Sequence, residues 1–397
     1  MGKTKVMEIS RGIAEAIKAC RPQVISAYPI TPQTHIIEHL AQMVADGELD
    51  CEFVSADSEF AAASIVHGAS ATGVRTYTAS ASQGLLLMTE VLWNMAGTRL
   101  PVVLTGANRV VSAPISIQVD HQDTLSLRDS GVMQMYVEDA QEAYDAHIQA
   151  YKLAEDPDIL LPILVCVDGW SLTHTWEPIE LLDQGLVDEF LPPYHPVQYL
   201  TPDNPITYGS YADDGILMEF KYMMHRAMNC AKNKVVKIVD EFNEMCGRHH
   251  GGLIQEYRTD DAKICMLAMG SIVGTIKVAI DEMRAEGIKV GLVKVRFYRP
   301  FPADELIKAV KNAQCIAVID RDVSVGAGGA LSADVKAALC NLSDRPLVLG
   351  CLAGIGGREI TKSTVRSIVA NAQRAIDTGR VEETDEWIGL NPEVREG

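Results

Sequence analysis

Three side chains in the first 110 residues have types and positions that could do chemistry together. Thr31 lies between two prolines in a Tyr-Pro-Ile-Thr-Pro turn at 28–32, Glu59 follows an apolar run, and Arg109 follows another. Proline fixes φ on either side of Thr31, so its hydroxyl projects from a stiff turn. A guanidinium suits a carboxylate substrate, and a carboxylate beside a ring nitrogen can tune the acidity of a cofactor. We therefore take these three residues as candidate catalytic groups.

Each candidate also has a plain structural alternative, which its local sequence leaves open. Thr31 could N-cap the helix expected at 33–45, with Pro32 as the first helical residue. Glu59 could complement the dipole at the start of the next helix. Arg109 could be a solvated surface arginine. A shared pocket would distinguish these alternatives from catalysis.

The elements that must position these residues follow an α/β pattern. Expected strands alternate with expected helices, which predicts a doubly wound, mostly parallel sheet. The strands are expected at 24–27, 52–55, 74–79, 100–105, 132–137 and 160–167, and the helices at 7–19, 33–45, 58–72, 84–97 and 139–154. Thr31, Glu59 and Arg109 follow three different strands, as expected for a crevice at the carboxyl edge of an open sheet.

The rest of the chain predicts an arm, a linker and a second domain. We expect the first domain over 1–240, including a proline-rich arm at 168–215 that packs on a neighbouring subunit or on its own domain. A polar linker is expected at 241–261, and a second α/β domain at 262–397 with a peripheral acidic end. Its Gly-Ala-Gly-Gly segment at 326–329 forms either an anion site at a helix start or a tight turn.

Composition excludes several classes of protein. With 397 residues, of which 47% are hydrophobic, the chain can build two cores. A net charge of -18 disfavours nucleic acid. No apolar run is long enough for a membrane span and no signal-peptide core is present, so we expect a cytoplasmic protein. Nine dispersed cysteines without a Cys-x-x-Cys pair predict reduced thiols, and we expect no metal ligands in the candidate site.

Two further polar motifs are ambiguous. His121, between acidic residues at 120–123, is expected to be an exposed loop histidine without a special role. Ser82 and Gln83, followed by a glycine, mark either a point where the backbone approaches a ligand or an ordinary helix start.

Taken together, these segments resemble the alpha subunit of pyruvate:ferredoxin oxidoreductases, within the 2-oxoacid:ferredoxin oxidoreductase family. The resemblance rests on the segments at 28–32, 58–59, 78–84, 107–109, 120–123 and 161–169. It implies a thiamine-diphosphate-binding fold of the pyrimidine type, followed by a transketolase C-terminal-like α/β domain. It also implies oxidative decarboxylation of a 2-oxoacid, pyruvate foremost, with coenzyme A and ferredoxin, or the reverse synthesis.

The resemblance assigns roles to residues that match its motifs. Glu59 corresponds to the glutamate that contacts the aminopyrimidine of thiamine diphosphate. Thr31 and Arg109 correspond to residues that hold the 2-oxoacid. By the same resemblance, Asn108 lies beside the substrate, and the residues expected to line the cofactor are Pro29, Ile30, Ser82 and Gln83.

One departure predicts partner subunits. The Gly-Asp-Gly…Asn segment that binds the diphosphate through Mg²⁺ in thiamine enzymes is absent from the sequence. The resemblance therefore implies a beta subunit with the diphosphate and Mg²⁺ site, a gamma subunit, and a ferredoxin-like delta subunit, with 4Fe-4S clusters on the partners. The open alternatives are another 2-oxoacid or oxalate as substrate, a non-catalytic scaffold subunit, and a stand-alone nucleotide-binding oxidoreductase.

Overall fold

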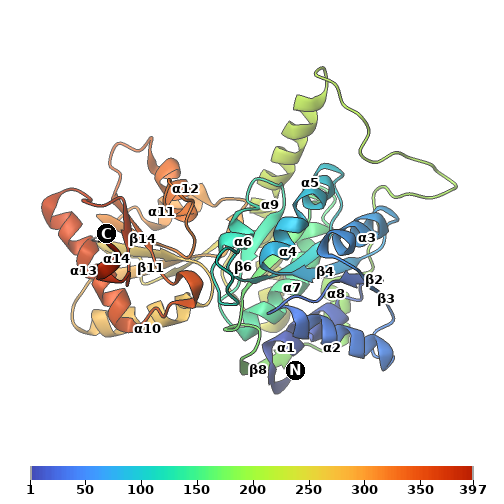
Figure 1. Cartoon of the computed structure of the whole chain (residues 1–397), viewed down its shortest axis with the longest axis horizontal. Helices are drawn as coiled ribbons and strands as arrows, with labels where there is room; N and C mark the ends of the chain where they lie inside the picture. The colour runs from blue at the N-terminus through green and yellow to red at the C-terminus, as the bar shows by residue number, and fades with distance from the viewer. Residues whose placement is uncertain (1, 396–397) are drawn as a thin grey trace.

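The computed structural model describes residues 2–395, which form two α/β units side by side (Figure 1). The sheet of the first unit has seven strands in the order β12-β6-β7-β5-β4-β2-β3. All neighbouring pairs are parallel except β12 with β6. The strands are β2 (Val24–Ala27), β3 (Glu52–Ser55), β4 (Thr76–Ser80), β5 (Val103–Asn108), β6 (Met133–Tyr136), β7 (Ile163–Asp168) and β12 (Phe297–Arg299).

Helices cover both faces of this sheet, because its central strands are apolar on both sides. Successive strand residues point to opposite faces. Val103 and Val165 accordingly pack in one core, whereas Leu104 and Leu164 pack in another. The helices are α1 (Ile9–Ala19), α2 (Thr34–Ala45) and α7 (Ala140–Ala154) in the first core, and α3 (Glu59–Ala71), α4 (Ser82–Leu87), α5 (Thr89–Gly97) and α6 (Gln122–Leu125) in the second. The predicted doubly wound α/β fold is confirmed.

The segment expected as an arm divides into two parts. Its first part packs on its own unit: β8 (Trp176–Leu181) pairs with β1 (Lys3–Glu8) in a small antiparallel sheet, and α8 (Gln184–Phe190) follows. The rest leads to α9 (Leu217–Cys246), whose first turns project away from the body together with the preceding loop (Figure 1). No helix formed by residues 2–395 is long and apolar enough to cross a membrane.

The second unit has a six-stranded sheet in the order β15-β14-β13-β10-β11-β9. Only β9, which lies within the expected linker, runs antiparallel to its neighbour. The strands are β9 (Ile254–Tyr257), β10 (Ile264–Ala268), β11 (Val290–Val295), β13 (Cys315–Asp320), β14 (Leu347–Leu352) and β15 (Asp385–Trp387). The helices are α10 (Ile272–Ala285), α11 (Ala303–Ala309), α12 (Ala330–Leu339), η1 (Ile355–Gly357), α13 (Lys362–Thr378) and α14 (Pro392–Arg395). The acidic end thus contributes an edge strand.

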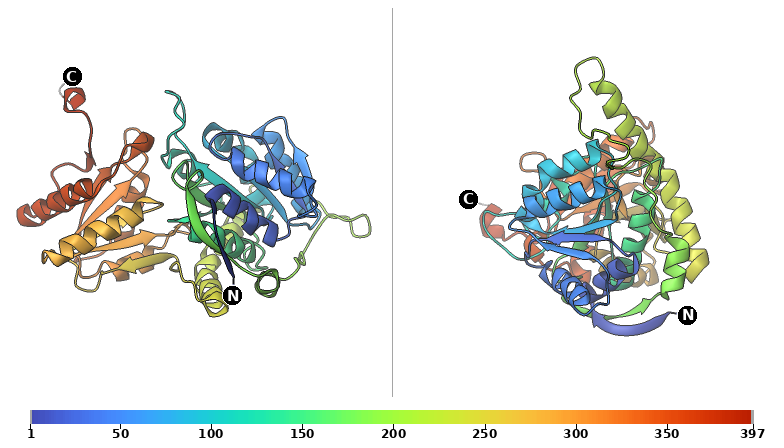
Figure 2. Two further views of the ribbon diagram at one scale, coloured as in Figure 1. Left: turned by 90° about the horizontal axis from the view of Figure 1, so that it is seen from below. Right: turned by 90° about the vertical axis from the view of Figure 1, so that its right-hand side faces the viewer.

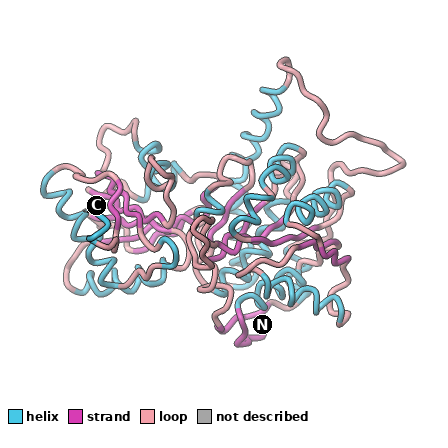
Figure 3. The backbone as a smooth tube through the Cα atoms, viewed as in Figure 1, coloured by secondary structure: helices cyan, strands magenta, loops and turns pink. Residues whose placement is uncertain are grey.

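Buried charges and a shared strand join the two units. After β11 the chain crosses back, and β12 adds an edge strand to the first sheet. Glu142 of α7 is fully buried and binds Lys294 and Arg296 of the second unit, with Arg296 Nε donating to Glu142 Oε1 over 2.7 Å. Breaking such a pair leaves an uncompensated buried charge, so the contact holds the units in one arrangement. The left view of Figure 2 shows the two units side by side, and Figure 3 shows the strands inside each unit with helices around them.

Candidate active site

The turn that carries Thr31 is fixed to the edge of the sheet by Gln33. The buried Gln33 amide donates from Nε2 to the carbonyl of Ala79 at the end of β4, over 2.7 Å. Gln33 is also the N-cap residue of α2, and no side chain caps this helix. The alternative in which Thr31 N-caps α2 is therefore wrong. Thr31 itself is exposed at the edge of the turn.

Arg109 lies against this turn and is not a surface residue. Its side chain is 7% exposed, and Nη1 donates to the Thr31 carbonyl over 2.7 Å. Nη2 lies 3.4 Å from Gln83 Oε1, and Nε is buried without a hydrogen-bond partner among the described residues. The structure thus brings Thr31, Gln83 and Arg109 together. Because Arg109 binds the carbonyl of Thr31, the Thr31 hydroxyl is left available to bind a ligand.

Glu59 is the first residue of α3, but its carboxylate does not cap the helix. That task falls to Ser58, whose Oγ accepts from the amide of Ala61 over 3.2 Å. Glu59 is 8% exposed, and its carboxylate accepts no hydrogen bond in the described part of the chain. A β-carbon placed on Gly84 would lie 2.6 Å from Glu59 Oε1, so only glycine allows the start of α4 to approach this carboxylate so closely. Glu59 therefore packs against the turn that carries Gln83.

Asp123 forms hydrogen bonds that connect the candidate residues to one another, and we did not predict its role. Its buried carboxylate accepts from the Ser82 amide over 2.9 Å, from the Arg109 amide over 3.0 Å and from Asn108 Nδ2 over 2.9 Å. Burial raises the pKa of Asp123, and these hydrogen bonds oppose that rise. The acidic motif at 120–123 was the available signal, but sequence could not show that Asp123 faces inward.

Ser82 adopts a backbone conformation that non-glycine residues rarely use, with φ of 52°. Its Oγ donates to the carbonyl of Val110 over 2.5 Å. Strained residues of this kind concentrate at ligand sites, where the surrounding structure enforces them. Ser82 also begins α4, so the alternative of a helix start agrees with the structure.

His121 contradicts the expectation of an exposed loop histidine. It is 1% exposed, and its Nε2 lies 2.8 Å from Asp168 Oδ1 at the end of β7. Arg321 of the second unit donates to the other Asp168 oxygen over 2.6 Å. Burial alone would raise the pKa of Asp168, but the charges of Arg321 and His121 outweigh burial and hold it well below its usual value. The motif at 120–123 thus connects the site to the second unit.

The glycine-rich segment at 326–329 does not offer free amides to an anion. The first amides of α12 are bound by carboxylates of this chain: Leu331 N donates to Asp320 Oδ1 over 2.7 Å, and Ala330 N to Asp322 Oδ2 over 3.2 Å. The alternative of a tight structural turn is therefore the one that agrees with the structure.

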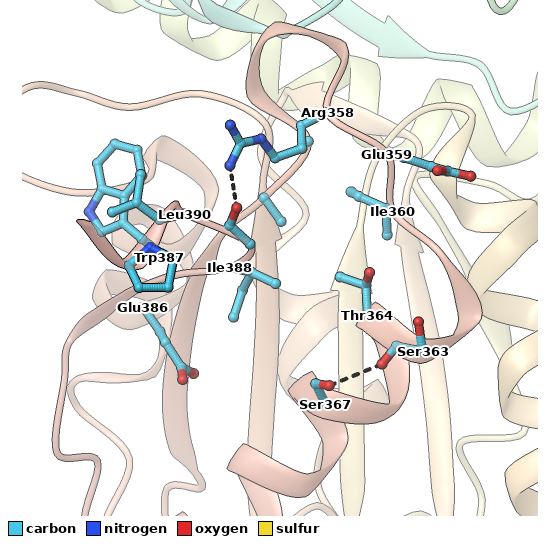
Figure 4. A pocket seen from close by; sticks show the side chains of 14 residues that line it. Arg358, Glu359, Ile360, Ser363, Thr364, Ser367, Glu386, Trp387, Ile388 and Leu390 are labelled. Atoms are coloured by element: carbon cyan, nitrogen blue, oxygen red, sulfur yellow. Dashed lines mark hydrogen bonds between the residues drawn. The ribbon is translucent and has the colours of Figure 1, made fainter. Parts of the chain in front are cut away.

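A cavity of about 470 Å³ lies in the second unit, away from the candidate residues (Figure 4). Hydroxyl groups of α13, Trp387 and Arg358 line it, and Arg358 bonds to the Gly389 carbonyl. None of the candidate residues contributes to its wall.

The polar groups of the candidate site fit a nitrogen-rich cofactor ring. Three buried polar atoms among the candidate residues and Ser80, which lies beside Glu59 at Gly84, lack hydrogen-bond partners in the described structure, namely Ser80 Oγ, Asn108 Oδ1 and Arg109 Nε. Buried polar atoms are normally paired, so each unpaired atom calls for a partner. Together with the unpaired Glu59 carboxylate, these atoms offer the donors and acceptors that an aminopyrimidine needs.

Two family models match the sequence, one over each unit. A family model described as "Pyruvate flavodoxin/ferredoxin oxidoreductase, thiamine diP-bdg" matches residues 15–240. A second, "Pyruvate:ferredoxin oxidoreductase core domain II", matches residues 262–365. The chain belongs to the pyruvate:ferredoxin oxidoreductase family. The first match covers most of the first unit, and the second match covers most of the second unit.

Relatives within the family match along nearly their whole length. "Pyruvate synthase subunit PorA" of Methanosarcina barkeri is 50% identical, covering 95% of this chain and 94% of the relative. The protein of the same name from Methanothermobacter thermautotrophicus is 46% identical, covering 98% and 99%. "Ketoisovalerate oxidoreductase subunit VorA" of Pyrococcus horikoshii is 41% identical, covering 97% and 98%. The family therefore includes relatives named for two different 2-oxoacids.

Solved structures agree on the fold. A 2-oxoglutarate:ferredoxin oxidoreductase from Magnetococcus marinus aligns with a TM-score of 0.69 at 19% identity, over 94% of this chain and 66% of that one. A split-gene transketolase aligns with a TM-score of 0.55 at 13% identity, over 94% and 98%. The expected likeness to thiamine-dependent folds is confirmed.

Proposed function

We propose that this chain is the alpha subunit of a heteromeric, thiamine-diphosphate-dependent pyruvate:ferredoxin oxidoreductase. The reaction converts pyruvate and coenzyme A to acetyl-CoA and carbon dioxide and reduces ferredoxin, or runs in reverse. The proposal rests on one observation. Arg109 contacts both the Thr31 carbonyl and Gln83, and Gln83 lies in the first turn of α4, which packs against Glu59. Membership of the family supplies the chemical class.

Glu59 is the residue we assign to the cofactor. Bound thiamine diphosphate supplies a nucleophilic carbon and an electron sink for decarboxylation. Glu59 holds a proton at a nitrogen of the aminopyrimidine, and its low exposure keeps water from competing for that proton. Pro29, Ile30, Ser82 and Gln83 line the same end of the site in this proposal.

Arg109 and Thr31 are the residues we assign to the substrate. Arg109 grips the carboxylate that leaves as carbon dioxide, since a guanidinium pairs with a carboxylate through two hydrogen bonds. Thr31 donates its hydroxyl to the substrate oxygen where negative charge builds, which stabilises the transition state more than the ground state. Asn108 lies next to Arg109, and both are positioned by Asp123.

The remaining parts of the cofactor site belong, in this proposal, to partner subunits. A beta subunit holds the diphosphate and Mg²⁺, because the usual motif is missing from this sequence. Gamma and ferredoxin-like delta subunits complete the complex and carry 4Fe-4S clusters that pass electrons to ferredoxin. Exposed aromatic rings beside the site, Tyr28 at 39% and Phe60 at 41%, provide apolar surface for such a partner. Further exposed apolar residues, including Leu217, Met218 and Phe220, gather at the start of α9.

Replacing Arg109 by Met in the assembled complex tests the assignment. Methionine keeps the length and apolar stem of the side chain but removes the charge, so we expect kcat/KM for pyruvate to fall by about 10²–10³-fold. Assembly, followed by size-exclusion chromatography, should be unchanged. Arg374→Met, at an exposed position on α13, is the matched control. Unchanged turnover in the Arg109 variant would refute the catalytic role and favour a scaffold subunit.

The substrate is tested separately by assaying the complex with five acids. Pyruvate, 2-oxobutyrate, 2-oxoisovalerate, 2-oxoglutarate and oxalate should be compared by kcat/KM. We expect pyruvate to rank first. A higher value for 2-oxoisovalerate would place this chain with the ketoisovalerate enzymes, and would leave the roles of Arg109 and Glu59 intact.

A further inference from the structure

A group of metal-ligand side chains lies outside the candidate active site, where three segments of the first unit meet. Glu8 ends β1, His35 and His39 lie on α2, and His174 lies in the loop between β7 and β8. Figure 1 shows α1, α2 and β8 together at the lower edge of this unit. Neither the candidate site nor the proposed reaction uses these residues.

The distances within this group are close to those of a metal site. Glu8 Oε1 lies 2.7 Å from His35 Nδ1. One ligand atom each from Glu8, His35 and His174 lies within 4.8 Å of the others. Ligand atoms of tetrahedral zinc are about 3.3 Å apart when each lies about 2.0 Å from the metal. Glu8 Oε1 and His35 Nδ1 lie closer together than this, and the 4.8 Å limit is wider than this, so binding of an ion requires the side chains to rotate.

His39 lies beside this group and is the candidate for a fourth ligand, although its ring nitrogens are not within 4.8 Å of all three ligand atoms. Residues four apart face the same side of a helix, so His39 projects from α2 beside His35. Its Nε2 lies 3.7 Å from Glu8 Oε2, beyond hydrogen-bond distance, and this buried atom has no hydrogen-bond partner in the described chain. A buried imidazole nitrogen without a partner is costly unless a proton donor or a cation satisfies it.

Glu8 contacts the histidines and does not cap its own helix. It occupies the N-cap position of α1, yet its side chain makes no capping hydrogen bond. Its carboxylate instead turns to His35 and His39 and is only 13% exposed. Carboxylate oxygens and imidazole nitrogens are the ligands of mixed nitrogen and oxygen metal sites. A largely buried carboxylate beside imidazoles, with no capping hydrogen bond, fits such a site.

The surroundings of His174 resemble the outer shell of a metal site. Its Nδ1 lies 2.7 Å from Thr173 Oγ1, which orients the ring and leaves Nε2 for a ligand. The Trp170 ring packs against it with 4.2 Å between the ring centroids.

We propose that Glu8, His35, His39 and His174 form a binding site for one divalent transition-metal ion, of which Zn²⁺ suits the ligands best. Three imidazoles and one carboxylate match the nitrogen and oxygen ligands of tetrahedral zinc. The site is separate from the Mg²⁺ that we assign to the beta subunit. It extends our sequence analysis, which expected no metal ligands in the candidate site.

The consequence of this site is structural, because it fastens α2 to the loop before β8. This loop begins next to Gly169, where an added β-carbon would lie 2.7 Å from Pro32 Cγ in the Thr31 turn. The metal would therefore hold α2, which follows the Thr31 turn, to the loop that packs against Pro32 of the same turn.

Titration of the full-length chain with ZnCl₂, after treatment with a chelator, tests the proposal. Calorimetry should show one Zn²⁺ per chain, and Co²⁺ should give the visible absorption of a tetrahedral site. The double variant His35→Ala/His174→Ala should bind Zn²⁺ at least about 100-fold more weakly. Thr173→Val, which keeps all ligands, should lose about 10–100-fold. His225→Ala removes an exposed histidine of α9 and should bind as the unchanged chain does.

Thermal unfolding provides a second measurement that does not depend on the variants having equal stability. Zn²⁺ should raise the Tm of the unchanged chain and of His225→Ala, because binding to the folded state alone stabilises it. It should not raise the Tm of the double variant. The proposal is overturned if the unchanged chain binds no more Zn²⁺ than the double variant, or if Zn²⁺ raises both Tm values equally. Neither result depends on enzymatic activity, so the proposed function is tested independently.

Discussion

Asp123 offers the sharpest test of how this fold builds the candidate site, through the substitution Asp123→Asn. The buried carboxylate accepts four hydrogen bonds. Oδ2 accepts from the amides of Ser82 and Arg109, and Oδ1 accepts from Asn108 Nδ2 and the Thr124 amide. An asparagine amide keeps one oxygen and replaces the other by NH₂. Whichever way the amide faces, its NH₂ group then lies against two N–H donors of the protein, and these two donors lose their acceptor.

The magnitude follows from these two lost contacts. Leaving a buried donor unsatisfied costs about 1–3 kcal/mol, so two cost about 2–6 kcal/mol. Burial raises the pKa of Asp123, which means that its charge is costly to bury, and its removal offsets part of the loss. We therefore expect Asp123→Asn to destabilise the chain by about 2–4 kcal/mol, which lowers Tm by about 4–16 °C for a unit of this size.

Activity should fall as well, because the lost contacts hold Ser82 and Arg109. In the assembled complex we expect kcat/KM for pyruvate to decrease at least about tenfold. Asp129→Asn, at an exposed position six residues further on, is the control. Thermal unfolding of the full-length chain and steady-state assays of the complex provide the two readouts. If Asp123→Asn matches the control in both, Asp123 does not organise this site.

Two other predictions concern contacts that sequence alone did not show. Gly84→Ala puts a methyl group too close to Ser80 Oγ and 2.6 Å from Glu59 Oε1, so both side chains must move. We expect at least about a tenfold loss of kcat, measured by assay, and a cost of about 1–3 kcal/mol, measured by Tm. Gly97→Ala, with nothing near its added methyl, should change neither. Burial alone would raise the pKa of Glu142, but Lys294 and Arg296 outweigh burial and lower it to about 2 from an ordinary 4.5. Because the folded-state pKa is depressed, the contribution of Glu142 to the free energy of unfolding is fully present above about pH 5 and is lost as pH falls toward 2. Glu142→Gln should cost about 3–5 kcal/mol at pH 7 and flatten the acid limb of a plot of Tm against pH, while the exposed Glu244→Gln should leave that plot unchanged; an acid limb of equal steepness in the Glu142 variant would rule out this origin.

The sequence by itself determined the architecture, because burial leaves a local pattern. Central strands such as β5 and β7 are apolar on both faces, and amphipathic helices separate them, so their order and approximate bounds could be predicted. The motifs around Thr31, Glu59 and Arg109 were also visible, since each follows a strand that the pattern locates. These inferences needed only neighbouring residues, whose side-chain alternation is fixed by the backbone.

Only the tertiary structure decided which polar groups meet, because hydrogen bonds between distant segments leave no local pattern. Sequence could not show that Arg109 binds the Thr31 carbonyl, or that Asp123 accepts hydrogen bonds from the amides of Ser82 and Arg109. His121 looked exposed because acidic residues surround it in sequence. It is buried because Asp168 and the second unit close over it.

The same limit explains the unexpected strands. β1 and β8 pair across more than 160 residues of sequence, and β12 leaves the second unit to join the first sheet. Short edge strands have weak local signals, because much of their stability comes from the partner strand and not from their own residues. The pairing of β1 with β8 also brings Glu8 and His174 to α2, so the proposed metal site became visible only in three dimensions.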